Sequence, residues 1–77
     1  MSAAPIISKA VGNWETSFTS DNKMIHSFGG GYNVVADMST YTAYKMKDGI
    51  VKEQFSIKGM LLETWVQILI NFEKAVK

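Results

Sequence analysis

The C-terminal segment constrains the fold of this chain most, because it holds the clearest helical pattern. From Gly59 to Lys77 the sequence reads GMLLETWVQILINFEKAVK. At about 100° per residue its polar side chains fall on one narrow arc, and apolar side chains fill the rest except at Glu73. A helix on one sheet needs an apolar stripe of roughly 100°, and this stripe is about twice as wide. We therefore predict a helix over residues 59–77 with more apolar surface than a single sheet can cover.

The surplus apolar surface of this helix predicts self-association. One set of side chains is expected to pack on a sheet: Trp65, Leu69, Phe72 and Val76. A second stripe is expected to form the seam of a homo-oligomer, most simply a dimer: Leu62, Val66 and Ile70. The chain has 77 residues, no cysteine and one histidine, so a large core, disulfides and a structural zinc site are not expected to stabilise it. Association between subunits remains as the stabilising contribution.

Residues 13–57 alternate between apolar and polar side chains in short runs that turn residues separate. This pattern is typical of antiparallel strands joined in chain order. The three glycines at 29–31 predict a bend, because a strand pattern follows them where a phosphate-binding loop would need a helix. We predict one α+β domain over residues 1–77: an antiparallel β-meander of four to five strands with one C-terminal α-helix packed on a face, in a dimer. Residues 1–11 are expected to form a loosely ordered N-terminal arm.

The first predicted hairpin turns at residues 20–22. A three-residue loop sets Phe18 opposite Met24 and needs a residue in the left-handed region, which Asn22 tolerates. The same register places His26 opposite Thr16 on the inward face. A lone inward histidine is most often a hydrogen-bonded core residue, and the functional alternative is a polar contact for a ligand or a pH-sensitive contact.

Trp14, Phe18 and His26 would together line a pocket for a small apolar ligand. The run Gly12-Asn13-Trp14 is similar to the Gly-x-Trp start of lipocalin-like barrels, and the run IHSFGGGY adds to the similarity. The resemblance covers the N-terminal part of the chain and implies a carrier of small apolar molecules. Because 77 residues are too few for an eight-stranded barrel, it implies a half-barrel closed by dimerisation.

The second predicted hairpin turns at Asp48-Gly49, a strong signal for a type I′ turn between two alternating runs. A two-residue loop would place Met46 on an apolar face toward the helix. It would also place Lys45 directly opposite Lys52 on the other face. Like charges opposed across strands are mildly destabilising, and an anionic partner would offset that repulsion.

The lysine side of this hairpin predicts a face for single-stranded nucleic acid, formed by Tyr41, Lys45, Lys47, Lys52 and Lys58. On such a face lysines follow the phosphates and aromatic rings stack on bases. The order of elements, with strands before a tryptophan-bearing C-terminal helix and the junction KGMLLETWVQ, is similar to the single-stranded DNA-binding coactivators that dimerise through such a helix. The structural alternative is a solvated face whose lysines discourage aggregation at a sheet edge.

The sequence predicts no enzyme, because it pairs no nucleophile with a base and groups no carboxylates or metal ligands. No cofactor is expected. The start, MSAAPIISKAVG, lacks the regions of a signal peptide, and the helix is shorter than the ~20 apolar residues of a membrane span. We therefore expect a cytoplasmic chain without a membrane partner. The lead hypothesis is a small homo-oligomeric module that binds another protein as an adaptor or inhibitor. Nucleic-acid binding and carriage of an apolar ligand stay open as alternatives.

Overall fold

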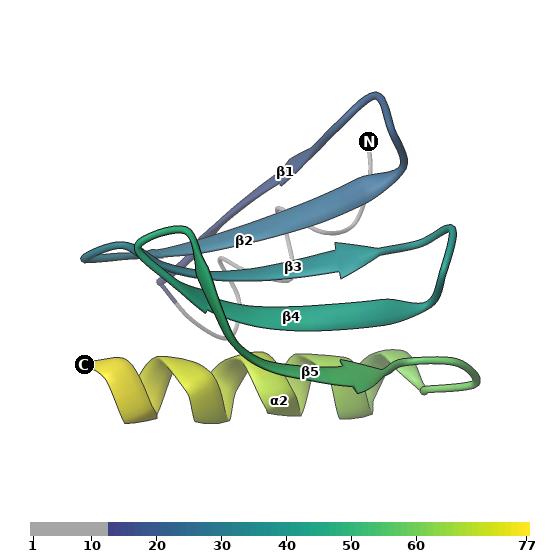
Figure 1. Cartoon of the computed structure of the whole chain (residues 1–77). Coiled ribbons are helices and arrows are strands. Elements are labelled where there is room, and N and C mark those ends of the chain that lie inside the picture. Colours follow the sequence, from purple (N-terminus) through teal and green to yellow (C-terminus); the bar gives the residue numbers. More distant parts are fainter. Residues whose placement is uncertain (1–12) are drawn as a thin grey trace.

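The computed structural model describes residues 13–77, where the chain forms five strands followed by one helix (Figure 1). The N-terminal arm expected over residues 1–11 lies outside the described residues. The elements are β1 Glu15–Phe18, β2 Lys23–Gly29, β3 Tyr32–Asp37, β4 Thr42–Lys47, β5 Ile50–Ser56 and α2 Leu62–Val76. The strands pair antiparallel in the order β1-β2-β3-β4-β5. The predicted α+β meander with a C-terminal helix is confirmed, with five strands.

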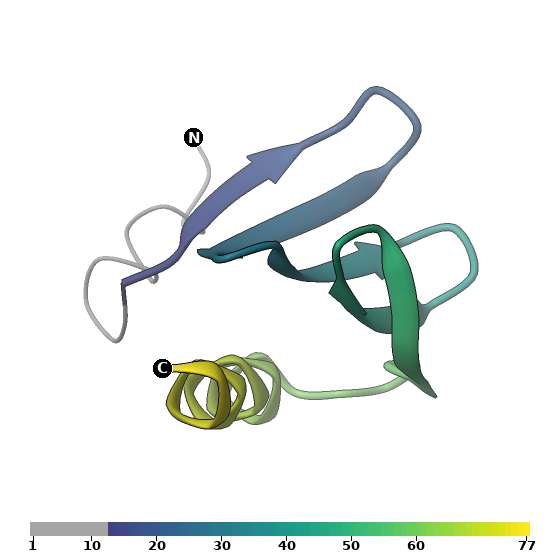
Figure 2. The same cartoon turned by 60° about the vertical axis from the view of Figure 1, so that its left-hand side comes forward.

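The sheet curves around one side of α2, so that sheet and helix form two layers (Figure 2). The side chains between the layers are buried: Trp14, Phe28, Val34, Ala36, Ala43, Trp65 and Leu69. The helix contributes Trp65 and Leu69 to this core, and Phe72 and Val76 pack against it. The sheet-facing set predicted from the helical pattern is therefore confirmed.

The helix begins later than the pattern predicted. It was predicted from residue 59, but Gly59 has φ +73°, in the left-handed region, and Leu61 is extended with φ −74° and ψ 150°. The Met60 amide donates to the Ile57 carbonyl at 3.1 Å, which closes a turn before the helix starts. The first helical hydrogen bond runs from the Trp65 amide to the Leu61 carbonyl. The connection thus leaves three apolar residues, at 60–62, at the helix start.

The first hairpin has the predicted register. Phe18 pairs with Met24, and Thr16 pairs with His26. Asn22 has φ 66°, the left-handed conformation that a three-residue loop requires. Local turn chemistry and alternation were sufficient here.

The second hairpin has the predicted two-residue turn but a different register beyond it. Met46 pairs with Val51, and then a β-bulge intervenes, so that Lys45 pairs with Glu53. The predicted opposition of Lys45 and Lys52 is therefore wrong. The bulge exchanges a like-charge pair for an ion pair, with 3.4 Å between Lys45 Nζ and Glu53 Oε1.

The inward face of β4 is also the reverse of the prediction. Met46 was expected to face the helix, but Ala43 is fully buried and Lys45 Nζ lies 5.9 Å from the centroid of the Phe72 ring. The cause is the pairing with β3, where Val34 lies opposite Lys45. Directly opposed residues share a face of a sheet, and Val34 is fully buried beneath the helix. The face of β4 was therefore decided by its other neighbour.

Candidate binding groove

An apolar groove with a volume of about 300 Å³ opens beside the start of α2. Its walls come from three places in the chain: β2, the β3–β4 connection, and the β5–α2 connection with the first helical turns. Met24 and Trp65 line its inner part. Met38, Tyr41, Leu61 and Leu62 line it as exposed side chains.

Backbone contacts hold the two connections beside each other. The Ile57 amide donates to the Tyr41 carbonyl at 2.8 Å, which joins the β5–α2 connection to the residue before β4. Tyr41 has a left-handed backbone conformation, with φ 54°, at the end of the β3–β4 connection. The Met38 amide donates to the Asn22 carbonyl at 3.0 Å and so ties the β3–β4 connection to the first hairpin. Segments far apart in the sequence are thus held around one groove.

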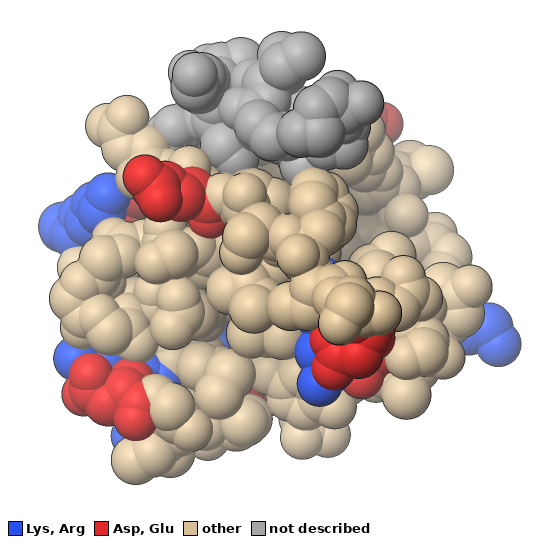
Figure 3. Space-filling model, turned by 90° about the horizontal axis from the view of Figure 1, so that it is seen from above, with Lys and Arg blue, Asp and Glu red and all other residues tan. Residues whose placement is uncertain are grey.

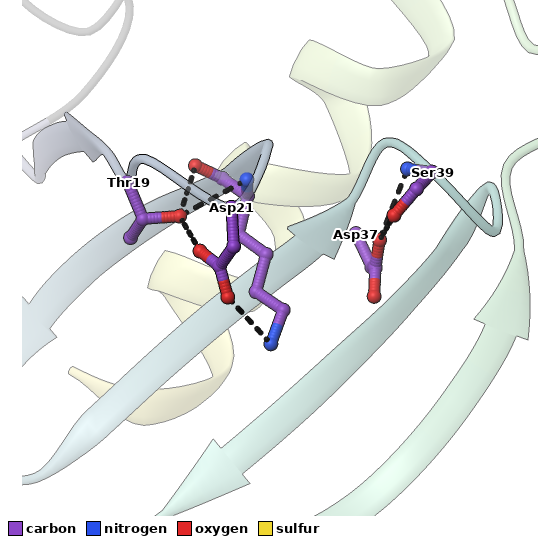
Figure 4. Close-up of polar contacts among 5 residues, drawn as sticks. Thr19, Asp21, Asp37 and Ser39 are labelled. Atoms are coloured by element: carbon purple, nitrogen blue, oxygen red, sulfur yellow. Dashed lines mark hydrogen bonds and ion pairs between the residues drawn. The ribbon is translucent and has the colours of Figure 1, made fainter.

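Two carboxylates brace the turns next to Met38 (Figure 4). Asp21 accepts a hydrogen bond from the Thr19 hydroxyl and forms an ion pair with Lys23 at 3.4 Å. Asp37 accepts from the Ser39 amide at 3.0 Å and from the Ser39 hydroxyl at 2.6 Å. The hydrogen bond from Thr19 lowers the pKa of Asp21, and those from Ser39 lower the pKa of Asp37. Both carboxylates are therefore engaged in turn structure.

Exposed apolar side chains concentrate around this groove. Leu61 and Leu62 are 63% and 62% exposed, and Met38 and Tyr41 are exposed on the other side. Together they are four of the seven large apolar side chains that lie exposed among residues 13–77. Single exposed apolar residues are ordinary, but a contiguous group beside a hollow is characteristic of an interaction surface.

Three of the five methionines in the chain line the groove: Met24, Met38 and Met60. Methionine has an unbranched, polarisable side chain, which adapts to differently shaped partners. The groove can therefore adjust to apolar side chains of more than one shape. This cluster was not predicted from the sequence, where its one local signal is Met38, an apolar residue inside the polar turn Asp37–Thr40.

The predicted ligand pocket of Trp14, Phe18 and His26 is divided by the fold. Trp14 and His26 are buried in the core, whereas Phe18 is 55% exposed. None of the three lines the apolar groove. The Trp14 ring packs instead on Phe28, with 5.3 Å between the ring centroids. Ligand binding by these three residues stays a prediction.

His26 lies behind the groove and faces Trp65, with 5.6 Å between the ring centroids. Its Nδ1 is hydrogen-bonded with the Thr16 hydroxyl at 2.9 Å, and its Nε2 has no hydrogen-bond partner among the described residues. Burial lowers the pKa of His26 from 6.5 to about 4, because it disfavours the charged imidazolium. The side chain is therefore neutral at pH 7 and sits as a core residue.

The predicted seam residues differ in exposure. Leu62 lines the groove and is exposed, whereas Val66 and Ile70 are half-buried. Ile70 packs against the core. The most accessible part of the stripe thus belongs to the groove, and oligomerisation stays a prediction.

The residues predicted to bind nucleic acid are also divided. Lys45, Lys47 and Lys52 line a second pocket, Tyr41 lines the apolar groove, and Lys58 lines neither. On the face seen in Figure 3, acidic and basic residues lie near one another, with no broad area of one sign. The five side chains therefore do not form one continuous row. Nucleic-acid binding stays a prediction.

Among residues 13–77 no three His, Asp or Glu side chains are grouped so as to hold a metal ion, and no helix is long and apolar enough to cross a membrane. Comparisons with models of protein families, with curated proteins and with solved structures found no match to this chain.

Proposed function

We propose that this chain is a non-catalytic binding module whose apolar groove receives apolar side chains of a partner protein. The observation that carries the proposal is the group of exposed apolar side chains around one hollow: Met38, Tyr41, Leu61 and Leu62. Covering them removes apolar surface from water, at roughly 25 cal/mol per Å². A partner that fills the hollow and covers its rim gains most from this burial.

A protein segment fits this surface better than a small molecule does. Pockets for small molecules usually enclose about 70–90% of the ligand. Here the side chains of Leu61 and Leu62 stand more than half exposed at the side of the groove. An amphipathic helix would place successive anchor residues in the hollow and on these leucines, as in other helix-in-groove complexes.

The groove offers little to a chemical reaction. Apart from the phenol of Tyr41 and the buried indole N–H of Trp65, its lining side chains are apolar. His26, the single histidine, is buried behind Trp65 with its pKa lowered to about 4. These features support a binding role without catalysis.

The test is to select amphipathic 15-residue peptides that bind the protein and to locate them by amide chemical shifts. We expect the largest shifts at Met38, Tyr41 and Leu61–Trp65. Leu62→Glu should weaken binding by at least about tenfold, because it buries a charge in an apolar contact. Ile50→Glu is the matched control, since Ile50 is 59% exposed and lies outside the groove. Equal losses in both variants, or shifts elsewhere, would contradict the proposal.

A second copy of the chain is the second candidate occupant. The same surface carries both protruding leucines and a hollow, which is the self-complementarity that a two-fold dimer needs. Sedimentation at micromolar to millimolar concentration should then show a dimer, and Leu62→Glu should convert it to a monomer. A monomer at all concentrations would reject this occupant and leave the heterologous partner.

A further inference from the structure

A second pocket, the lysine pocket, lies between the β4–β5 hairpin and the C-terminal part of α2. Its volume is about 280 Å³, and the residues that define its chemistry are Tyr32, Lys45, Lys47, Lys52, Glu53 and Phe72. On α2, Phe72 is ten residues beyond Leu62, or about 15 Å along the helix. The lysine pocket is thus separate from the apolar groove.

Positive charge dominates the walls of this pocket. Three lysines and one glutamate line it, which leaves a formal charge of +2. The ammonium groups are not fully occupied. Each has three N–H donors, of which Lys45 directs one toward Glu53, and Lys47 uses two, on the Gly30 carbonyl at 2.8 Å and on Asp48 at 3.0 Å.

Lys52 lines the pocket from the β-bulge of the second hairpin. The bulge removes Lys52 from the pairing with β4, which continues from Val51 to Glu53. Its side chain makes no ion pair or hydrogen bond with any other residue in 13–77. Bulges commonly re-aim a side chain beside a functional site. The bulge therefore sets Glu53 opposite Lys45 and leaves Lys52 outside the pairing, with both residues at the pocket.

Aromatic rings form the apolar part of the pocket. Lys47 Nζ lies 4.7 Å from the centroid of the Tyr32 ring, and the rings of Tyr32 and Phe72 meet edge to face at 6.2 Å. Lys45 Nζ lies 5.9 Å from the Phe72 ring, and its side chain is 28% exposed. Partly covered ammonium groups beside apolar walls attract an anion more strongly than fully solvated ones do, because water screens them less.

We propose that the lysine pocket binds a small organic anion: an aromatic or apolar body against Tyr32 and Phe72, with a carboxylate or phosphate head among Lys45, Lys47 and Lys52. The volume of about 280 Å³ is just below the usual range for ligand pockets, about 300–1,000 Å³, so the ligand is small. Glu53 competes with the ligand for Lys45. The site is independent of the apolar groove and does not rest on its proposed function.

The test uses three probes with one aromatic body: 2-naphthoate, 2-naphthyl phosphate and the neutral 2-naphthamide. Titrations are followed by amide chemical shifts of the full chain. We expect the two anions to shift Tyr32, Lys45, Lys47 and Phe72, and the neutral amide to bind at least about tenfold more weakly. The ratio between the two anions identifies the preferred head group. Inorganic phosphate alone should bind more weakly than the naphthyl phosphate, because it lacks the apolar body.

We expect two variants to change the affinity for the anions in opposite directions. Lys52→Met should weaken binding of the anions by about three- to tenfold, since a hydrogen bond to a charged group is lost. Glu53→Gln should tighten it by a similar factor, because it removes the competing carboxylate. Lys58→Met is the control for net charge and should change affinity by less than about twofold, because Lys58 lies outside the pocket.

Three results would overturn the proposal. The neutral probe could bind as tightly as the anions, Lys58→Met could weaken binding as much as Lys52→Met, or Glu53→Gln could have no effect. A fourth would replace it: if a single-stranded oligonucleotide binds and shifts Lys58 and Tyr41 while the small anions do not bind, the lysines serve a nucleic-acid interface. Shifts confined to the apolar groove would also reject the lysine pocket while leaving the proposed protein interaction intact.

Discussion

The two ends of α2 lie beside surfaces of different chemistry, although both surfaces are formed by the sheet and the helix. Beside Leu62 the groove is apolar and rich in methionine, and beside Phe72 the pocket carries three lysines. The inward face of β4 follows the same change, from the buried Ala43 to Lys45. A single strand and a single helix can therefore support two different surfaces, because the inward residues change type along their length.

The two surfaces depend on different interactions with whatever binds them. Binding at the apolar groove depends on the burial of apolar surface, which carries no charge that salt could screen. The lysine pocket depends on charge, which salt screens over about 8–10 Å at physiological ionic strength. Binding at the two ends should thus respond differently to salt.

The largest expected effect on stability is at Leu69, which lies between the two ends of α2. Leu69 is 2% exposed and lies on α2 between Trp65 of the groove and Phe72 of the pocket. Leu69→Ala should lower the free energy of unfolding by about 2–5 kcal/mol, through lost burial and the cavity left behind. Leu61→Ala is the matched control and should cost far less, because Leu61 is 63% exposed. Urea denaturation measures both, and equal losses would show that Leu69 is not part of a packed core.

Acid should act next most strongly, through His26 at the groove end. The pKa of His26 is lowered to about 4 in the folded state from 6.5, so the unfolded chain binds more protons between these values. The free energy of unfolding should therefore be unaffected above pH 6.5 and fall below it, by up to about 1.4 kcal/mol per pH unit, until about pH 4. Urea denaturation between pH 7.5 and 4 measures the slope.

His26→Gln is the control for this slope, because it removes the titrating group. The variant should lose the dependence between pH 6.5 and 4, even if its stability at pH 7 is lower. Losses below that window arise from carboxylates such as Asp21 and Asp37, whose pKa values are lowered by their hydrogen bonds. An unchanged slope in the variant would exclude His26 as the cause.

A smaller effect is expected at the turn behind the lysine pocket. Gly29 and Gly31 have almost the same backbone angle, φ +82° and +83°, but different surroundings. A Cβ on Gly29 would meet no atom within 4 Å, whereas one on Gly31 would collide with the Asp48 carboxylate. Both alanine variants should lose about 1 kcal/mol for the left-handed conformation. Gly31→Ala should lose more and disturb Lys47, which donates to Asp48. Denaturation separates the two, and equal losses would mean that Asp48 moves freely aside.

Local patterns were sufficient for much of the fold. The spacing of Trp65 and Leu69 identified the buried side of the helix, and Asn22 identified the loop that sets Phe18 opposite Met24. These features depend on residues close together in the chain, whose preferences act before any distant contact forms. The turn at Asp48-Gly49 belongs to the same class, since both residues have the positive φ of a type I′ turn.

The candidate sites could not be predicted in this way, because neither is local. The apolar groove needs Met24, Met38 and Leu61 from three separate connections or strands. The lysine pocket needs Tyr32 from β3, the lysines of the second hairpin and Phe72 from α2. A sequence lists these residues without the distances that group them.

By itself the sequence determined the order of the strands and the helix, the first turn, and the side of the helix that is buried. Those follow from periodicity and from the few residues that tolerate left-handed backbone. Only the tertiary structure decided which face of β4 meets α2, because Lys45 must share the face of its neighbour Val34. It also decided that the chain has an apolar end and a basic end. In a sheet, the face on which a residue lies is fixed by its partner on each neighbouring strand. The sequence of one hairpin does not contain the pairing with the next strand, so it cannot determine that face.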